Sequence, residues 1–365
     1  MKLIATTLLL FIISNTYAQI REVNLFLNKR DLSTIERETS KFLKAQKLPG
    51  MTLVIAKSGK IIFSKSYGYA HVSRKVKLEP KHKMSISNLS QVFTSTAIMK
   101  LLEEGKISLE DKVLGPGSIF AKEFPKVRKY EAMVTVRHLL EQTAGKEWAT
   151  YYLRKGRNAM EKTAYVLLKQ KLYKKPGERV YNSGFCYFLL GRIIEKKTGK
   201  TYIEYLKEIT KDHLESGIGI LGQSNATLKD VAVHYDEKGK ASNLSNDSYN
   251  IDAKNGIVCS PHDFMNLLLS IDGLPAKKDL LTAQAVKIMQ SRSTANQYEG
   301  KGFTFNQNGD IVHCWYRDAC ISAYKVRTDG ITWVLMANGK SNRSKLAEGF
   351  LTFPDNLLAK MKDIP

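Results

Sequence analysis

Long hydrophobic runs are scarce in this chain of 365 residues. The clearest covers residues 3–13, and it is too short to cross a bilayer, which takes about 20 apolar residues. Lys2 before this run and Thr16-Tyr17-Ala18 after it give the layout of a secretory signal peptide. We therefore expect residues 1–18 to be removed and Gln19 to begin an exported protein, periplasmic or extracellular, without a transmembrane segment.

Signatures of metal and cofactor sites are missing as well. The seven histidines form no His-x-x-x-His or His-Glu pair of the kind typical of zinc sites. The sequence also has no glycine-rich loop of the kind that binds phosphates. We expect no metal and no cofactor.

Cysteine is rare, with four residues, Cys186, Cys259, Cys314 and Cys320. An exported protein can form disulfides, and four cysteines allow three pairings between which the sequence does not choose. A chain of this length buries a core that does not depend on a disulfide.

Acidic residues are outnumbered, with 35 Asp and Glu against 57 Lys and Arg, for a formal net charge of +22. Such a charge can attract nucleic acid, anionic lipid or acidic wall polymers. The lysines are scattered without a long basic run, which favours lysine-rich composition over a specific polyanion site. We expect no specific binding of nucleic acid.

The order of elements predicts an α+β fold. A helix is predicted over residues 33–46, where Ser33 and Glu36 match a capping box. A β-hairpin follows over 51–57 and 61–67, and a buried helix over 89–104 ends at Gly105. The pattern then predicts helices at 135–143, 157–171 and 185–198, strands at 311–316, 320–327 and 331–337, and a helix at 342–352.

This order predicts an antiparallel β-sheet flanked by N- and C-terminal helices, with an inserted, mainly helical subdomain. No segment has the composition of a linker. Apolar residues make up 43% of the chain and charged residues 25%, which is typical of a globular protein. We expect one domain over residues 19–365, with its sheet part at about 33–80 and 300–365 and its helical part at about 81–299.

Five segments in a fixed order carry a family resemblance. They are LPGMTLVIAKSGKIIFSKSYGYAHV (48–72), FTSTAIMKLLEEGKISLEDKV (93–113), VTVRHLLEQTAG (134–145), LLGRIIEKKTGKTY (189–202) and NGIVCSPHDF (255–264). From about residue 35 to 360 the chain resembles the serine β-lactamase and penicillin-binding-protein superfamily, nearest its class C β-lactamases, D-alanyl-D-alanine carboxypeptidases and esterases. The resemblance implies a cleft between the sheet and the helical part.

The resemblance also implies three motifs around that cleft, and all three are substituted. The Ser-x-x-Lys motif, counted back from FTSTAI, falls on Asn88 and Gln91. The Tyr-x-Asn motif, placed by Pro176-Gly177 and the LLG at 189–191, falls on Asn182 and Gly184. The Lys/His-Thr-Gly strand triplet reads His313-Cys314-Trp315, so a tryptophan replaces the glycine. The leading hypothesis is therefore a β-lactamase-related pseudoenzyme with no catalytic residue.

Three other serines fit the role of the missing nucleophile poorly. Ser90 lies about 200° around the helix from Asn88, and Ser183 lies between the two substituted loop positions. Ser322-Ala-Tyr-Lys325 matches Ser-x-x-Lys, but residues i and i+3 of a strand point to opposite faces. Two alternatives stay open: a one-residue slip that brings Tyr181 into the site, and a thiolate at Cys314, which we place on the cleft.

Three functions follow. The first is an exported protein without serine-hydrolase machinery that binds a small ligand, a cell-wall component or a protein partner. The second is an active esterase, D-aminopeptidase, carboxypeptidase or β-lactamase-like hydrolase with a rearranged nucleophile. The third is a basic adhesion or wall-binding protein in which the cleft plays no part.

Overall fold

The computed structural model describes residues 22–25, 27–145, 172, 174–220, 230–242, 252–317, 319–339 and 343–361. The predicted signal peptide at 1–18 and the predicted helix at 157–171 lie outside these residues. Among the described helices, none is both long and apolar enough to cross a membrane.

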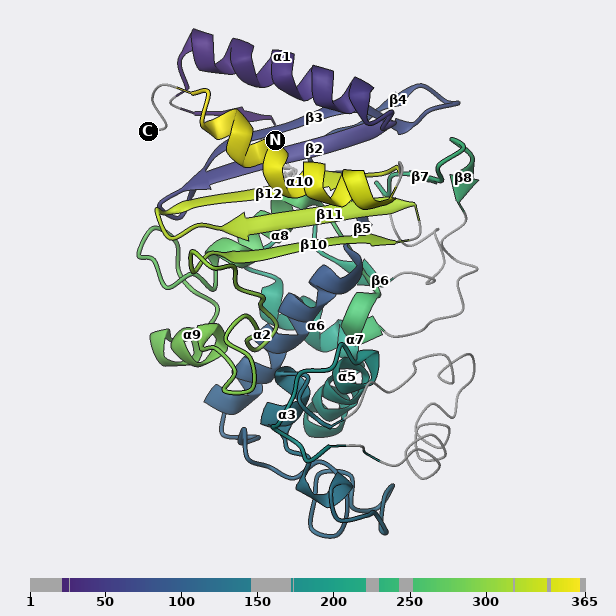
Figure 1. Ribbon diagram of the computed structural model, residues 1–365, viewed down its shortest axis with the longest axis vertical. Helices are drawn as coiled ribbons and strands as arrows, with labels where there is room; N and C mark the ends of the chain where they lie inside the picture. Colours follow the sequence, from purple (N-terminus) through teal and green to yellow (C-terminus); the bar gives the residue numbers. More distant parts are fainter. Residues whose placement is uncertain are drawn as a thin grey trace, which may run out of the picture.

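A seven-stranded antiparallel sheet joins the two ends of the chain (Figure 1). Its order is β1-β3-β2-β12-β11-β10, and β4 pairs with β3. The strands are β1 (Val23–Asn24), β2 (Gly50–Lys57), β3 (Lys60–His71), β4 (Val76–Lys77), β10 (Ile311–Arg317), β11 (Cys320–Val326) and β12 (Ile331–Ala337). The predicted hairpin and the three predicted C-terminal strands are confirmed.

Strands β2 and β12 lie at the centre of the sheet and are buried on both faces. Because successive side chains of a strand point to opposite faces, Trp333 and Leu335 pack toward α1 (Lys29–Ala45) and α10 (Arg343–Leu358). Val334 and Met336 pack on the opposite face, in the core that includes α8 (Pro261–Leu269). Two hydrophobic cores therefore hold the sheet between helices.

Both flanking helices differ from their predicted bounds. Helix α1 begins after Asn28, whose side chain accepts a hydrogen bond from the Asp31 amide at 2.9 Å. Ser33 lies inside this helix, so the predicted capping box is wrong. Helix α10 continues through Pro354 because Leu357 and Leu358, beyond the predicted end at residue 352, are buried in the core that packs against the sheet.

The helical part lies on the other side of the sheet from α1 and α10 (Figure 1). Its helices are α2 (Ser90–Glu103), α3 (Val136–Leu140), α5 (Gly184–Thr198), α6 (Tyr202–Thr210), α7 (Asp252–Asn255), α8 and α9 (Ala283–Gln290), with 3-10 turns η1 (Ser87–Leu89) and η2 (Glu131–Met133). Short strands β5 (Met84–Ser85), β6 (Gly219–Ile220) and β9 (Ile257–Cys259) form a second sheet, and β7 (His234–Tyr235) pairs with β8 (Ala241–Ser242).

Two predicted helix ends are confirmed. Gly105 follows α2 with φ of +66° and Gly199 follows α5 with φ of +71°, in the left-handed region that favours glycine. Helix α3 is shorter than the predicted 135–143. The predicted class, an antiparallel α+β fold with an inserted helical part, is confirmed.

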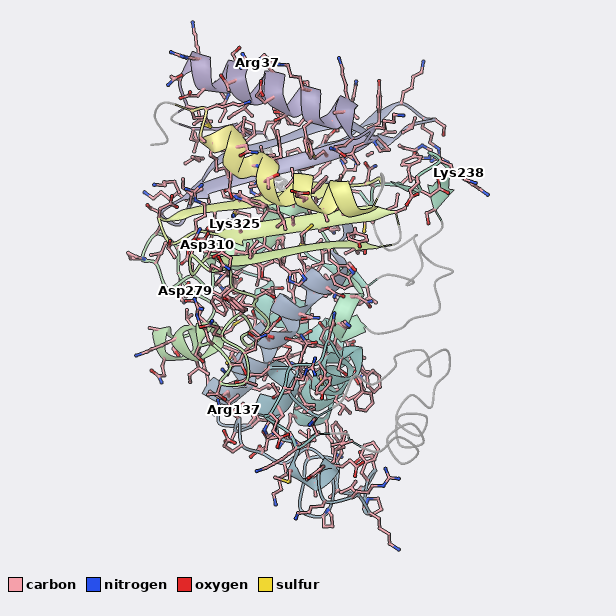
Figure 2. The ribbon with its side chains drawn as sticks, viewed as in Figure 1. Arg37, Arg137, Lys238, Asp279, Asp310 and Lys325 are labelled. Carbon is pink, nitrogen blue, oxygen red and sulfur yellow. The ribbon has the colours of Figure 1, made fainter. Side chains whose placement is uncertain are left out.

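Cationic side chains are spread over the described surface. Figure 2 shows Arg37 on α1, Lys238 beside the β7–β8 hairpin and Arg137 in the helical part, each in a separate region. Many of these lysines and arginines pair with a nearby acid, as Lys196 does with Glu123 at 2.6 Å. These observations agree with the interpretation of the charge as scattered.

Candidate functional site

A cleft opens where the edge strand β10 faces η1, the start of α2 and the loop before β10. It holds about 570 Å³, counting the solvent space at its mouth. The cleft contains five of the residues predicted for the site, namely Asn88, Gln91, Asn182, His313 and Trp315.

Asn88 and Gln91 form the wall on the helical side. Asn88 lies in η1, directly after Ser87, whose φ of +47° turns the chain into the helix. Gln91 is in the first turn of α2, so the two side chains share one face. Both residues are buried and both line the cleft. Neither amide is a nucleophile or a base at neutral pH.

His313 and Trp315 form the opposite wall on β10. Their rings are stacked, with centroids 6.3 Å apart and 19° between the planes. The His313 Nε2 and Trp315 Nε1 atoms are buried and have no hydrogen-bond partner among the described residues. Burial, with a smaller contribution from Lys254, lowers the pKa of His313 to about 4, so this ring is neutral at pH 7.

The placement of Cys314 on the cleft is wrong. Its side chain points to the other face of the sheet, where Sγ lies 3.8 Å from the carbonyl oxygen of Ala347 in α10. Alternation along β10 puts His313 and Trp315 in the cleft and therefore Cys314 out of it. Burial also raises the pKa of the Cys314 thiol to about 12, which removes the thiolate on which a cysteine mechanism depends.

The four cysteines form no disulfide. Cys186, Cys259 and Cys320 are buried and Cys314 is half-buried, and none of the four is joined in a disulfide. In the β10–β11 ladder Cys314 is opposite Ala323, while Cys320 is opposite Arg317. A bond between Cys314 and Cys320, which the sequence allowed, is not present.

Of the two predicted loop positions, Asn182 lines the cleft and Gly184 does not. Asn182 is exposed at the rim of the cleft, where its Oδ1 accepts a hydrogen bond from Lys254 Nζ at 3.1 Å. Gly184 is the buried first residue of α5 and does not line the cleft. Tyr181 does not line it either, and its ring lies 5.8 Å from the Arg179 guanidinium. The slip that would bring Tyr181 into the site is not observed.

The alternative serines are also turned away. Ser90 is fully buried, and its Oγ donates to the Ser87 carbonyl at 2.6 Å and accepts from the Ile257 amide at 3.1 Å. Ser322 Oγ donates to a backbone carbonyl at 3.3 Å, whereas Lys325 pairs with an aspartate of α10 on the opposite face. The predicted separation of Ser322 from Lys325 is therefore confirmed.

Thr304 is a cleft hydroxyl that sequence reasoning missed. Its Oγ1 lies 3.5 Å from His313 Nδ1, at the long limit of a hydrogen bond. A hydroxyl beside a neutral imidazole resembles a nucleophile beside a base. No local motif marks Thr304, because the contact is made by the fold: the backbone amide of Val312 donates to the Thr304 carbonyl at 2.8 Å and holds the loop against β10.

Glu299 is the second group that the sequence did not reveal. It is half-buried and lines the cleft. Burial raises the pKa of its carboxyl to about 7, and the side chain forms no hydrogen bond or ion pair within the described part of the chain. A carboxyl with this pKa can exchange a proton near neutrality.

The loop that presents Glu299 and Thr304 is fastened by a buried ion pair. Lys301 Nζ lies 3.0 Å from Glu141 Oε1, and the two side chains are 1% and 7% exposed. Lys301 also donates to Ser291 Oγ at 2.9 Å, and Ser293 Oγ donates to Glu141 Oε2 at 2.7 Å. The loop over residues 291–304 is therefore held on the segment after α3.

A serine, a histidine and a glutamate also meet outside the cleft. His262 Nδ1 lies 3.1 Å from Ser64 Oγ, and His262 Nε2 lies 3.3 Å from Glu215 Oε1. Ser64 has no exposed surface because it is in β3 beneath α8. No substrate carbonyl can reach its hydroxyl, so this set joins β3 to α8 and is not a hydrolytic site.

Comparison with known proteins places this geometry in a family. The profile of the β-lactamase family matches residues 35–346. This chain belongs to the β-lactamase family. The match covers both the sheet and the helical part, between which the cleft lies.

Curated relatives agree with this assignment. The chain is 28% identical to Protein flp of Staphylococcus aureus (strain MW2) over 274 residues, which is 73% of this chain and 54% of that protein. It is 27% identical to Penicillin-binding protein 4* of Bacillus subtilis (strain 168) over 311 residues, which is 80% of this chain and 61% of that protein. The matched region spans little more than half the length of these relatives.

Solved structures share the fold. The octameric penicillin-binding protein homologue from Pyrococcus abyssi superposes with a TM-score of 0.73 at 24% identity, over 91% of this chain and 78% of that one. SurE superposes with a TM-score of 0.72 at 19% identity, over 91% of this chain and 75% of that one. The predicted resemblance to penicillin-binding proteins is confirmed at the level of fold.

Proposed function

We propose that this protein is an exported, non-catalytic member of the β-lactamase family whose cleft binds a small ligand. One observation carries the proposal: the cleft wall at the start of α2 presents the amides of Asn88 and Gln91 and no hydroxyl or amine. Acyl transfer needs an attacking atom and a base beside it. The cleft is open to solvent between its two walls, and polar and aromatic side chains line it.

Export is part of the proposal and rests on residues 1–18, with their apolar run and small-residue cleavage site. Expression of the full chain in a Gram-negative host, followed by fractionation and N-terminal sequencing, tests it. A mature protein in the periplasm or medium that begins at Gln19 supports export. Retention of Met1 on a cytoplasmic protein contradicts it.

The loss of catalysis is tested with three acylating probes: fluorescent penicillin, a fluorophosphonate and nitrophenyl esters. Two curated or structural relatives are named as penicillin-binding proteins, so penicillin is the natural first probe. We expect no covalent label and no turnover above the rate in buffer. Covalent labelling that a single substitution abolishes would overturn the proposal.

One observation favours a second candidate function, a hydrolase in which Thr304 attacks with His313 as base. Against it, the 3.5 Å contact is long and the lowered pKa of His313 makes the imidazole a weak base. Thr304→Val separates the two functions. If the wild type is labelled, the variant loses the label under the second function, whereas Thr352→Val on the exposed face of α10 keeps it.

A protein or wall partner remains the other binding mode of the first function. Pelleting with purified peptidoglycan at low and high salt tests it, because binding that rests on the positive charge weakens as salt rises. If high salt abolishes the pelleting and substitutions in the cleft leave it unchanged, the basic wall-binding function is favoured instead.

A further inference from the structure

The cleft lacks the positive charge that characterises the protein as a whole. The chain carries a formal net charge of +22, yet the described residues that line the cleft include no lysine or arginine. Glu299 is the one formally charged residue among them. Lys301, two residues along the chain, pairs with Glu141 instead.

The groups around Glu299 leave its charge without compensation. His313 on β10 is neutral at pH 7, and burial raises the pKa of Tyr324 on β11 and of Tyr187 on α5 above their ordinary value. Lys254 on α7 lies at the rim, where it donates to the Asn182 side chain. Glu299 is therefore the group in this part of the cleft that titrates near neutrality.

An uncompensated, half-buried carboxylate is unfavourable, and a cation that binds beside it restores the lost electrostatic energy. The opposite wall suits the same kind of ligand. The stacked rings of His313 and Trp315 offer an aromatic surface, and the Trp315 indole N–H is a donor without a partner among the described residues. Aromatic faces bind both flat apolar groups and ammonium ions.

We propose that Glu299 selects ligands that carry a protonated amine on an aromatic or apolar body, so that the cleft is specific for organic cations. This inference rests on the proposed function of the cleft as a binding site and names its ligand class. The amine binds the Glu299 carboxylate, the body lies against Trp315, and the amides of Asn88 and Gln91 supply further hydrogen bonds.

Three probes of one shape test the inference: benzylammonium, neutral benzyl alcohol and anionic benzoate. Their dissociation constants are measured by ligand-observed NMR at pH 8 with the full chain, Glu299→Gln and Glu348→Gln. Glu348 is exposed on α10, away from the cleft, and serves as the matched control. Urea midpoints of the three proteins verify that the variants are folded.

We expect benzylammonium to bind about ten-fold more tightly than benzyl alcohol, and benzoate to bind most weakly. Glu299→Gln should remove this preference by weakening benzylammonium about ten-fold while benzyl alcohol is unaffected. Glu348→Gln should change neither.

Equal binding of benzylammonium and benzyl alcohol by the wild type overturns the inference and leaves the cleft a ligand site. Absence of benzylammonium binding, or a preference that survives Glu299→Gln, overturns it as well. The proposed function fails on a different result, covalent labelling by an acylating probe, and that labelling leaves a measured cation preference intact.

Discussion

Removal of the Lys301 ammonium should destabilise the protein markedly. In Lys301→Met the apolar stem is kept, but Glu141 loses the ammonium 3.0 Å from its Oε1 and stays 7% exposed. Loss of one partner of a buried ion pair costs about 3–5 kcal/mol of unfolding free energy. Because Ser293 still donates to Glu141 and Arg137 lies 3.9 Å away, we expect a cost near the lower limit, about 3 kcal/mol.

Urea unfolding followed by tryptophan fluorescence measures this cost. Lys106→Met is the matched control, because its pair with Glu104 is exposed and should contribute less than about 1 kcal/mol. The double variant Lys301→Met/Glu141→Gln should recover part of the loss, since it leaves no buried charge without a partner. A cost under about 1 kcal/mol for Lys301→Met, or no recovery in the double variant, would refute the reasoning.

Three further predictions concern pH and backbone. His234 is buried with its pKa lowered to about 4, whereas the unfolded chain protonates near 6.5. Its contribution to unfolding free energy should therefore fall by up to about 3 kcal/mol from pH 7 to 4, and urea titrations should show the advantage of wild type over His234→Gln shrinking; a constant difference contradicts this. Gly302→Ala should cost about 2 kcal/mol or more in the same assay, because φ is +93° and a Cβ would lie 2.4 Å from Ser95 Oγ. Gly105→Ala, where φ is +66° and a Cβ would meet open space, should cost only about 1 kcal/mol. If the two variants lose the same stability, the clash with Ser95 does not contribute. Affinity for benzylammonium should rise from pH 6 to 8 as Glu299, with its pKa raised to about 7, loses its proton; a flat wild-type profile, or a rise that persists in Glu299→Gln, speaks against that group.

The sequence pattern predicted correctly those elements whose apolar residues recur with the period of the strand or helix that buries them. The hairpin and the C-terminal strands alternate or are fully apolar, and their predicted bounds lie within a few residues of those observed. The start of α1 was missed because Ser33 and Glu36 match a cap in sequence, while Asn28 makes one earlier. The end of α10 was missed because Pro354 is a helix breaker only when packing does not compensate.

The residues of the site likewise fall into those that a sequence motif locates and those that only the fold brings together. Asn88, Gln91 and His313 were found because motifs fix their register along the chain. The error at Cys314 arose because a triplet motif does not say which face of a strand meets the cleft. Glu299 is in a loop without a motif, and its place in the cleft depends on the ion pair that fastens that loop to a distant segment.

The walls of the cleft come from stretches as far apart in sequence as Asn88 and Tyr324. An unfolded or half-assembled chain cannot present them together, so whatever occupies the cleft binds the folded state alone. By mass action, a compound at a hundred times its dissociation constant adds about 2.7 kcal/mol to the stability of the whole protein. Melting temperature is thus a reporter of occupancy, and screening small amines by thermal shift can identify a ligand without following any reaction.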